Sequence, residues 1–380
     1  RTRTAESVFE VQDDSAQAIV AQLGIIMDGD AVVPSHAADT KNISAYELYL
    51  EAWQLFVDRR SLPRAIGLFE QAVATDPSFA RAWAGLAAIY NIAPGWGIVD
   101  RDYSMLAREA AETAIKLDPD LSLPYAVLAL GNTQDWPVDF EKSLALFDEA
   151  LARNPKNTTA YLWRMIVYID LGYFDRAEQD ARQCLEIDPA YSICRSFQAM
   201  AALFAGDTSR ALEIHEATLR HGFFGNSDPF LHFYAATGSE QTALIAMAAY
   251  NAGRGINKAT AYEFRALTDP TFDYQAERPL IRQAYIRAGE TEPEWDETNP
   301  NYLLLYRQYD KIQSVDNAYW WFPYPLEFRR SPHRKRLMRE SGLLEYWREH
   351  GFPQQCKPVG EDDFDCVLPE TPRTTRNLVN

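Results

Sequence analysis

Three of the six histidines, His215, His221 and His232, lie close together in the chain, where imidazoles could bind a metal ion or change charge near neutral pH. A metal site draws its other ligands from carboxylates or thiolates at short, regular spacing. None stands at such a spacing here, so ordinary surface or core histidines are the favoured interpretation. The acidic run at residues 361–363 lacks the glycine and terminal glutamate of an EF-hand loop. We therefore expect no metal ion and no cofactor.

Signatures of catalysis are missing from the sequence. It contains no Gly-x-Ser-x-Gly nucleophile elbow, no Gly-x-x-x-x-Gly-Lys-Ser/Thr phosphate loop, no His-Glu-x-x-His motif and no dinucleotide-binding glycine fingerprint. These absences argue against hydrolases, kinases and dehydrogenases, and we expect no catalytic residues. The enzymatic alternative is a small-molecule pocket beside the C-terminal residues, in which His215, Glu216 or Asp273 acts as acid or base.

The four cysteines form two pairs with the same spacing, Cys184/Cys194 and Cys356/Cys366. An even number with close pairing favours disulfides, which form in oxidising compartments. Cys184 and Cys194 stand five residues before and after Pro189, on two helices expected to be antiparallel, so they can face each other. The alternative is four reduced thiols, with Cys184 a small buried apolar side chain.

The charge balance argues against generic binding of polyanions. Among 380 residues, 37 are basic and 54 acidic, a net charge of −17, so we expect no binding of nucleic acid or anionic lipid. The basic run at residues 329–336 is therefore interpreted as a helix surface paired with nearby acidic residues. No apolar run reaches the roughly 18 residues that a membrane-spanning helix needs.

The sequence contains a repeat whose residue spacing indicates α-helices, so helices must position the histidines, cysteines and charged residues named above. Four prolines, each preceded by Asp or Asn, recur at intervals of 42, 36 and 34 residues: Pro77, Pro119, Pro155 and Pro189. Small or aromatic residues stand twelve, eight and five positions before each proline: Ala65/Phe69/Ala72, Ala107/Ala111/Ala114, Ser143/Phe147/Ala150 and Ala177/Ala181/Cys184. Steps of four and three place each triplet on one helix face, where small side chains admit a neighbouring helix. The proline then ends that helix.

Each unit therefore predicts helix, turn and helix, and the pattern resembles the tetratricopeptide repeat (TPR), whose unit is 34 residues long. The resemblance implies an all-α TPR solenoid, with Gly172 and Gly206 in tight turns that need positive φ. The second unit has about eight extra residues, 91–98, and such insertions often lie on a binding face. Trp96 is either a ligand anchor there or, as we favour, packs over the helix edge. A fifth unit, residues 191–221, lacks the proline and is degenerate.

In stacked TPR hairpins the first helix of each unit lines a concave groove, and the resemblance implies that a protein or peptide partner binds there. The repeat register gives the candidate groove residues, with Trp163 and Phe197 at the margin: Arg81, Asn91, Gln134, Leu162, Trp163, Ile166, Phe197 and Met200. Arg81 with Asn91 is the one hint of the carboxylate clamp found in chaperone-binding members. The lining is mostly apolar, so either a partner or the aromatic C-terminal residues of this chain must cover it.

Two further segments resemble a narrower group of proteins. Residues 8–23 resemble the helix that joins a TolB-like domain to TPRs in single-span bacterial regulators, and residues 342–366 resemble the closing segment of the same proteins. The cytoplasmic part of those regulators is a winged-helix DNA-binding domain, as in CadC-like proteins, or an adenylate cyclase, and neither is present here. The resemblance implies a periplasmic region that serves signal transduction by a transcriptional regulator or cyclase, with a membrane anchor upstream and no membrane contact of its own. A periplasmic scaffold that assembles envelope proteins is the alternative.

The pattern divides the chain into four segments. Residues 1–44 form a linker and helix at the tail of a TolB-like unit, and residues 45–222 hold about five TPRs. Residues 223–300 hold irregular helical hairpins, and residues 301–380 form a helical or irregular C-terminal block with a cystine-like tail. Within the block we expect an aromatic run at residues 319–325 and one basic helix over residues 332–350. An open array has to cover its last hydrophobic face, so the block is predicted to cap the stack.

Overall fold

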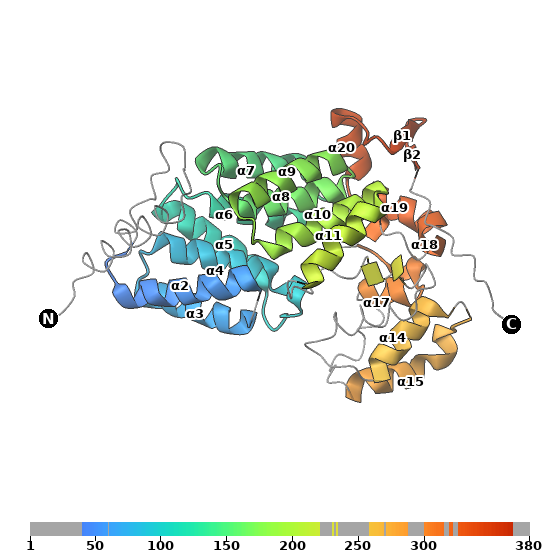
Figure 1. Ribbon diagram of the computed structural model, residues 1–380, viewed down its shortest axis with the longest axis horizontal. Helices are drawn as coiled ribbons and strands as arrows, with labels where there is room; N and C mark the ends of the chain where they lie inside the picture. The colour runs from blue at the N-terminus through green and yellow to red at the C-terminus, as the bar shows by residue number, and fades with distance from the viewer. Residues whose placement is uncertain are drawn as a thin grey trace. The chain divides into compact units, whose positions relative to one another are not determined.

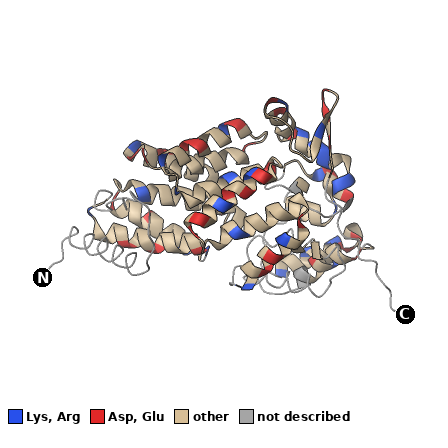
Figure 2. Cartoon of the chain, turned by 45° about the horizontal axis from the view of Figure 1, so that its top comes forward, with Lys and Arg blue, Asp and Glu red and all other residues tan. Residues whose placement is uncertain are grey.

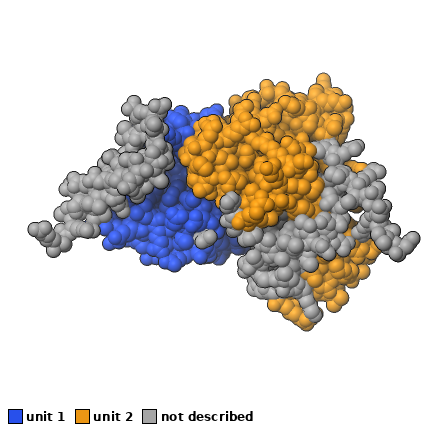
Figure 3. Space-filling view, in the orientation of Figure 1, with its two compact units in different colours: residues 1–131, 145–157 blue, residues 132–144, 158–380 orange. Residues whose placement is uncertain are grey.

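A computed structural model of the chain describes residues 40–59, 61–220, 230–231, 233–234, 258–269, 271–287, 300–314, 319–321 and 326–367. The chain forms two compact units, residues 1–131 with 145–157 and residues 132–144 with 158–380 (Figure 3). This division differs from the four segments expected from the sequence pattern, whose boundaries stay predictions. The helix expected over residues 8–23 lies outside the described residues.

Unit 1 is built from helical hairpins (Figure 1). Its elements are α2 (Ile43–Asp58), α3 (Leu62–Thr75), α4 (Ala80–Ile92), η2 (Pro94–Trp96), α5 (Tyr103–Leu117), α6 (Leu123–Gly131) and most of α7 (Phe140–Arg153). Side chains of Asn42 and Asp102 accept hydrogen bonds from the first turns of α2 and α5, which fixes where these helices begin. Helix α2 packs against α3, and α4 packs against α5.

Unit 2 continues the hairpins and adds a C-terminal part. Its elements are η3 (Asn132–Gln134), the start of α7, α8 (Thr158–Asp170), α9 (Phe174–Ile187), α10 (Ser192–Ala205), α11 (Thr208–Arg220), α14 (Lys258–Thr268), α15 (Tyr274–Arg287), α17 (Pro300–Leu305), η4 (Tyr309–Lys311), η5 (Tyr319–Trp321), α18 (Leu326–Arg330), α19 (Pro332–Glu340), α20 (Leu343–His350), β1 (Cys356–Val359) and β2 (Asp363–Cys366). Successive helices from α8 to α11 contact one another (Figure 1). None of the helices that can be described is both long and apolar enough to span a bilayer.

The same turn closes each predicted repeat. The backbone N–H of the Asp or Asn before each proline donates to the carbonyl four residues earlier, at 2.8 to 3.1 Å, in Asp76, Asp118, Asn154 and Asp188. The side chain of each of these four residues accepts the N–H two positions further on, at 2.9 to 3.0 Å. This side-chain turn explains why Asp or Asn recurs there. Asp269 forms the same turn at the end of α14, although no small-residue triplet precedes it.

Burial confirms the helical register of the repeats. All twelve residues of the four triplets, from Ala65 to Cys184, are at most 2% exposed. They lie on α3, α5, α7 and α9, the second helices of the hairpins. The fold is thus the expected all-α TPR solenoid, in which small side chains set the distance between helices.

The cysteines pair as predicted. Cys184 on α9 is joined to Cys194 on α10, with a Cα–Cα distance of 6.7 Å. Cys356 is joined to Cys366, and the two residues stand opposite each other in the antiparallel pair of β1 and β2. The cystine-like tail is therefore a short hairpin.

The expected single helix over residues 332–350 is wrong. Gly342 separates α19 from α20 with a φ of +90°, a conformation that a residue with a side chain rarely adopts. A Cβ atom there would lie 2.8 Å from the carbonyl oxygen of Val138, and Ser341 accepts the Val138 N–H at 2.9 Å. The break thus lets the chain bind residues of the same unit that precede α7.

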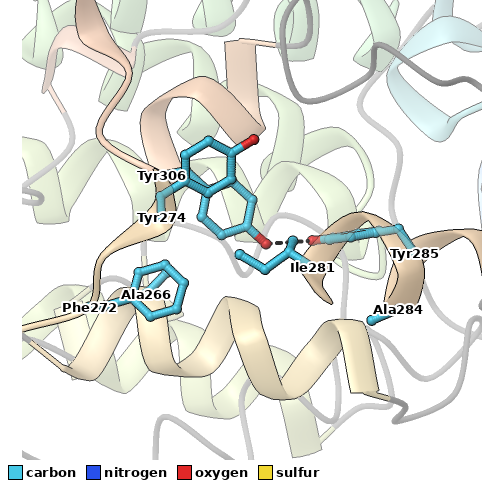
Figure 4. Close-up of a cluster of buried hydrophobic side chains, with 7 residues drawn as sticks. All are labelled: Ala266, Phe272, Tyr274, Ile281, Ala284, Tyr285 and Tyr306. Atoms are coloured by element: carbon cyan, nitrogen blue, oxygen red, sulfur yellow. Dashed lines mark hydrogen bonds between the residues drawn. The ribbon is translucent and has the colours of Figure 1, made fainter. Parts of the chain in front are cut away.

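A cluster of tyrosines forms a separate small core where α14, α15 and the residues after α17 meet (Figure 4). Its buried members are Ala266, Phe272, Tyr274, Ile281, Ala284, Tyr285 and Tyr306. The Tyr285 and Tyr306 hydroxyls lie 3.1 Å apart, and burial raises the pKa of both well above the usual value. The hydroxyls therefore stay protonated and hydrogen-bonded inside this core.

Enlarging a small interhelix residue should destabilise the array. Ala111 on α5 is fully buried, so Ala111→Leu should lower the free energy of unfolding by about 1–3 kcal/mol through overpacking. Glu112→Leu introduces the same side chain at the exposed neighbouring position and should change stability by less than about 0.5 kcal/mol. Urea unfolding of both variants measures the difference, and equal midpoints would refute the register.

Candidate protein-binding surface

The first helices of two neighbouring repeats in unit 2, α8 and α10, contact each other and carry equivalent residues 34 positions apart. The repeat register assigns ten of their residues to the concave side: Thr159, Leu162, Ile166, Ile169, Asp170, Ile193, Ser196, Met200, Leu203 and Phe204. Nine of them are at most 8% exposed, and Ile166 is half-buried. This apolar face is therefore already covered within the chain. A partner can reach it only if the covering residues move.

The candidate groove residues fall into two groups. Arg81 and Asn91 belong to unit 1, where Arg81 is half-buried and Asn91 is buried on α4. The other six belong to unit 2: Gln134 is exposed on η3, Ile166 and Phe197 are half-buried, and Leu162, Trp163 and Met200 are buried. The structure brings together those on α8 and α10, and their role in binding stays a prediction.

The end of α8 receives three tryptophan side chains from the C-terminal residues. We call residues 319–367 the docking segment. The last carbonyls of a helix have no partner within the helix. Here the indole N–H groups of Trp320 and Trp321 both donate to the Asp170 carbonyl oxygen, at 3.0 and 2.9 Å, and that of Trp347 donates to the Leu171 carbonyl oxygen at 3.0 Å. All three indoles are at most 3% exposed. Sequence reasoning missed these contacts, and the only signal for them was the expectation that aromatic residues cap the array.

Gly172 allows this close approach. Its φ is +75°, as expected for the turn between α8 and α9, and a Cβ atom there would lie 2.5 Å from the Trp321 ring. The Gly172 carbonyl accepts a hydrogen bond from the Gln355 side chain at 2.9 Å. Beside it, the Tyr173 hydroxyl donates to the Gly351 carbonyl at 2.5 Å, and burial raises the pKa of Tyr173 to about 12. The whole turn is thus bound by the docking segment.

The docking segment also reaches the concave face. The Trp321 ring meets Phe174 edge to face at a centroid distance of 5.5 Å, and Phe174 contacts Phe204 at 6.4 Å. Phe204 on α10 is the repeat equivalent of Asp170 on α8. The tryptophan pair therefore lies at the end of the face that the repeat register assigns to binding.

Arg334 contacts both members of the tryptophan pair, Trp320 and Trp321. It is 3% exposed, its Nε donates to the Trp320 carbonyl at 2.7 Å, and its guanidinium lies 5.6 Å from the Trp321 ring centre. Burial, and secondarily the positive charge of Arg329, lowers the pKa of Arg334 to about 9. The interpretation of residues 329–336 as an acid-paired surface thus fails for Arg334 but holds for Lys335, which binds Asp363 and Asp365.

Charge is otherwise dispersed. Acidic and basic residues are scattered over many of the helices (Figure 2). One ion pair lies between two helices and is largely buried. Arg164 on α8 forms two hydrogen bonds to the carboxylate of Asp180 on α9, with N–O distances of 2.7 and 2.8 Å. It joins the two helices of a repeat.

The proposed acid–base residues are not assembled into a site. His215 on α11 is 1% exposed, and its ring stacks on Phe230 at 3.8 Å. Neither ring nitrogen has a hydrogen-bond partner among the described residues, and burial lowers the pKa of His215 to about 4. Glu216 pairs with Arg220, whereas Asp273 accepts the N–H of Ala276 at the start of α15. His221 and His232 lie outside the described residues. Trp96 on η2 is 41% exposed and so partly covered, and its role stays a prediction.

Neutral His215 should make stability depend on pH. The folded protein holds this histidine with a pKa of about 4, whereas the unfolded chain has about 6.5, so stability is lost as pH falls through this interval. By pH 5 the loss from this group should reach about 2 kcal/mol. His215→Phe should remove this part of the pH dependence, measured by urea unfolding between pH 7.5 and 4.5. An unchanged pH profile in the variant would contradict the assignment.

Removing one indole N–H tests the docking contact. Trp347→Phe keeps an aromatic ring but leaves the buried Leu171 carbonyl without its donor, which should cost about 1–3 kcal/mol. Trp96→Phe is the matched control and should cost less than about 0.5 kcal/mol. Thermal unfolding and hydrogen exchange of α20 measure both, and a Trp347→Phe protein that behaves like the control would show that the bond contributes nothing.

Comparison with known proteins agrees with this fold. The sequence model of the tetratricopeptide repeat family matches residues 50–93 and 139–192. The Hsp70-Hsp90 organizing protein 3 of Arabidopsis thaliana is 28% identical over 82 residues, which are 22% of this chain and 15% of that protein. Hsp70-Hsp90 organizing protein 2 of the same plant is 32% identical over 75 residues, 20% of this chain and 13% of that protein. The chain thus spans under a sixth of the length of these relatives.

Among solved structures, a thermophilic TPR protein of Thermus thermophilus has a TM-score of 0.38 at 24% identity, and the match covers 46% of this chain and 90% of that protein. A tetratricopeptide repeat protein from Parabacteroides merdae has a TM-score of 0.40 at 19% identity, with coverages of 70% and 98%. The matched segments hold tetratricopeptide repeats and form a module suited to protein–protein interaction.

Proposed function

We propose that this chain is a non-catalytic protein- or peptide-binding TPR module, and that it forms the extracytoplasmic sensory region of a membrane-anchored bacterial regulator. The observation that carries the binding role is the paired face of α8 and α10. Its residues are mostly apolar, and the contacts described between the docking segment and this face lie at its Asp170–Phe204 end. A helix or extended peptide is the kind of ligand that such a face accepts.

Two observations support the location. The cysteines pair in both predicted combinations, and disulfides persist in oxidising compartments such as the periplasm. Residues 342–366, which resemble the end of single-span regulators, are part of the docking segment, and their Trp347 donates to the Leu171 carbonyl directly after α8. In this proposal, binding of a partner competes with docking and so changes the conformation that the regulator reports.

The Arabidopsis relatives are named for organizing two other proteins, Hsp70 and Hsp90. This name favours a protein-binding role for this chain as well. A periplasmic scaffold that assembles envelope proteins remains the second candidate, because a TPR surface can join partners without signalling. The full-length gene separates the two. A DNA-binding or cyclase domain followed by one membrane span supports the regulator, and a cleaved signal alone supports the scaffold.

Site-specific photo-crosslinking tests the binding face. A photoreactive residue at Phe197, half-buried at the groove margin, should capture a protein partner in cells that express the full-length gene. The same residue at Gln183, exposed on the second helix α9, is the control and should not. Trp321→Ala weakens docking and should increase capture at Phe197 severalfold.

Equal capture from Phe197 and Gln183, or no capture at Phe197 in either background, would refute the binding role. In a regulator, Trp321→Ala should also change the output of a transcriptional or cyclic-nucleotide reporter. An unchanged reporter together with increased capture would favour the scaffold.

A further inference from the structure

Two glutamates and a histidine from distant parts of the chain, whose side chains are of types that can bind a metal ion, meet on the surface of unit 2. Glu141 lies in the first turn of α7, and Glu349 and His350 are the last two residues of α20. One carboxylate oxygen from each glutamate and one imidazole nitrogen lie within 4.8 Å of one another. All three residues are exposed. Sequence spacing could not reveal this group, because 208 residues separate Glu141 from Glu349.

Aromatic packing brings the two helix ends together. The Tyr346 ring contacts Phe140 at 6.0 Å and Tyr173 at 6.3 Å, and it stacks on the His350 ring at 4.3 Å. Phe140 directly precedes Glu141 in the sequence. The same contacts that dock α20 therefore also set the backbone positions from which the three donors extend.

The donors are close but not bonded to one another. None of the three side chains forms a hydrogen bond or an ion pair in the part of the chain that the structure describes. The nearest basic side chain on α20, Arg348, is turned to Asp362 at 3.2 Å. Asp139, just before α7, accepts the backbone N–H of Lys142. Two carboxylates thus share a small space with an imidazole and no bound cationic side chain.

The spacing suits a small cation. If all three pairs of donor atoms were 4.8 Å apart, an ion at their centre would lie about 2.8 Å from each. Zinc ligands stand at about 2.0–2.2 Å, so each donor atom would have to move by less than about 1 Å. Exposed glutamate and histidine side chains make such movements by ordinary rotamer changes. A fourth position would stay open to water or another ligand, as in zinc sites with three protein ligands.

We propose that Glu141, Glu349 and His350 bind a divalent transition-metal ion of the zinc class, which fastens the end of α20 to the start of α7. The imidazole nitrogen distinguishes this set from an all-oxygen site for calcium or magnesium. The ion would secure the docking segment at a point separate from the tryptophans on α8. Binding of the metal ion would then stabilise the docked form of the protein.

Titration of the intact chain with ZnCl2 after chelator treatment tests the proposal. Calorimetry should find a site that His350→Ala and Glu141→Gln each weaken by at least about tenfold. Zinc should raise the Tm of the wild type and slow hydrogen exchange in α20, and neither change should appear in the two variants. His333→Ala, which removes a histidine of α19 outside the cluster, is the control and should bind zinc as the wild type does.

Two results would overturn the proposal. One is equal zinc affinity in the wild type and in both ligand variants, which would place any bound zinc elsewhere. The other is displacement of zinc by equimolar CaCl2, which would reduce the cluster to an unspecific acidic surface. Because Glu141→Gln and His350→Ala change exposed side chains, both proteins should fold. Visible absorption of bound Co2+ gives a second reading of the ligands, which both substitutions should change and His333→Ala should not.

Discussion

The packing of unit 2 depends on one requirement, which is that the carbonyl groups at the end of α8 need hydrogen-bond donors. A helix that ends inside a protein must find hydrogen-bond donors for its last carbonyls, because a buried acceptor without a partner costs free energy. Three indole N–H groups meet this need at Asp170 and Leu171. An indole supplies one donor and a large apolar surface together, so the same side chains also cover the end of the array. The glycine at 172 is the residue that leaves room for them.

The tryptophans also affect the face to which we assign partner binding. The face that the TPR register assigns to binding is apolar and buried within the chain, and the tryptophans that satisfy α8 lie at one end of it. If a partner binds this face, as we propose, docking and partner binding are alternatives for part of the same surface. The cystine hairpin, through Phe364 against Trp347, and Arg334, through Trp320, both support the docked form. In the proposed function, binding of a partner would release this defined segment.

Much of the fold followed from local sequence rules. The Asp/Asn-Pro pairs and the small-residue triplets mark helix ends and helix contacts, and both depend on residues that are near one another in the chain. Positive φ at Gly172 and the pairing of Cys184 with Cys194 follow from the same local register. The break at Gly342 was missed, because it depends on Val138, a residue 204 positions away.

The sites depend more strongly on long-range contacts. Trp347 binds a carbonyl 176 residues away, and Glu141 meets His350 across 209 residues. Aromatic residues after a helical array predict that they cover its last hydrophobic face. The repeat spacing cannot predict which carbonyl groups their side chains bind. Leu162 and Met200 were assigned to a groove by register, and the register could not tell that the chain itself covers them.

The most direct test of the docked structure is hydrogen exchange of the indole N–H groups, followed by NMR of the intact chain labelled with 15N at its nine tryptophans. The signals of Trp320, Trp321 and Trp347 should exchange far more slowly than that of the exposed Trp96, because their protons are buried in hydrogen bonds to α8 and the turn that follows it. Exchange of those three protons at the rate of Trp96 would contradict the docking on which the account depends.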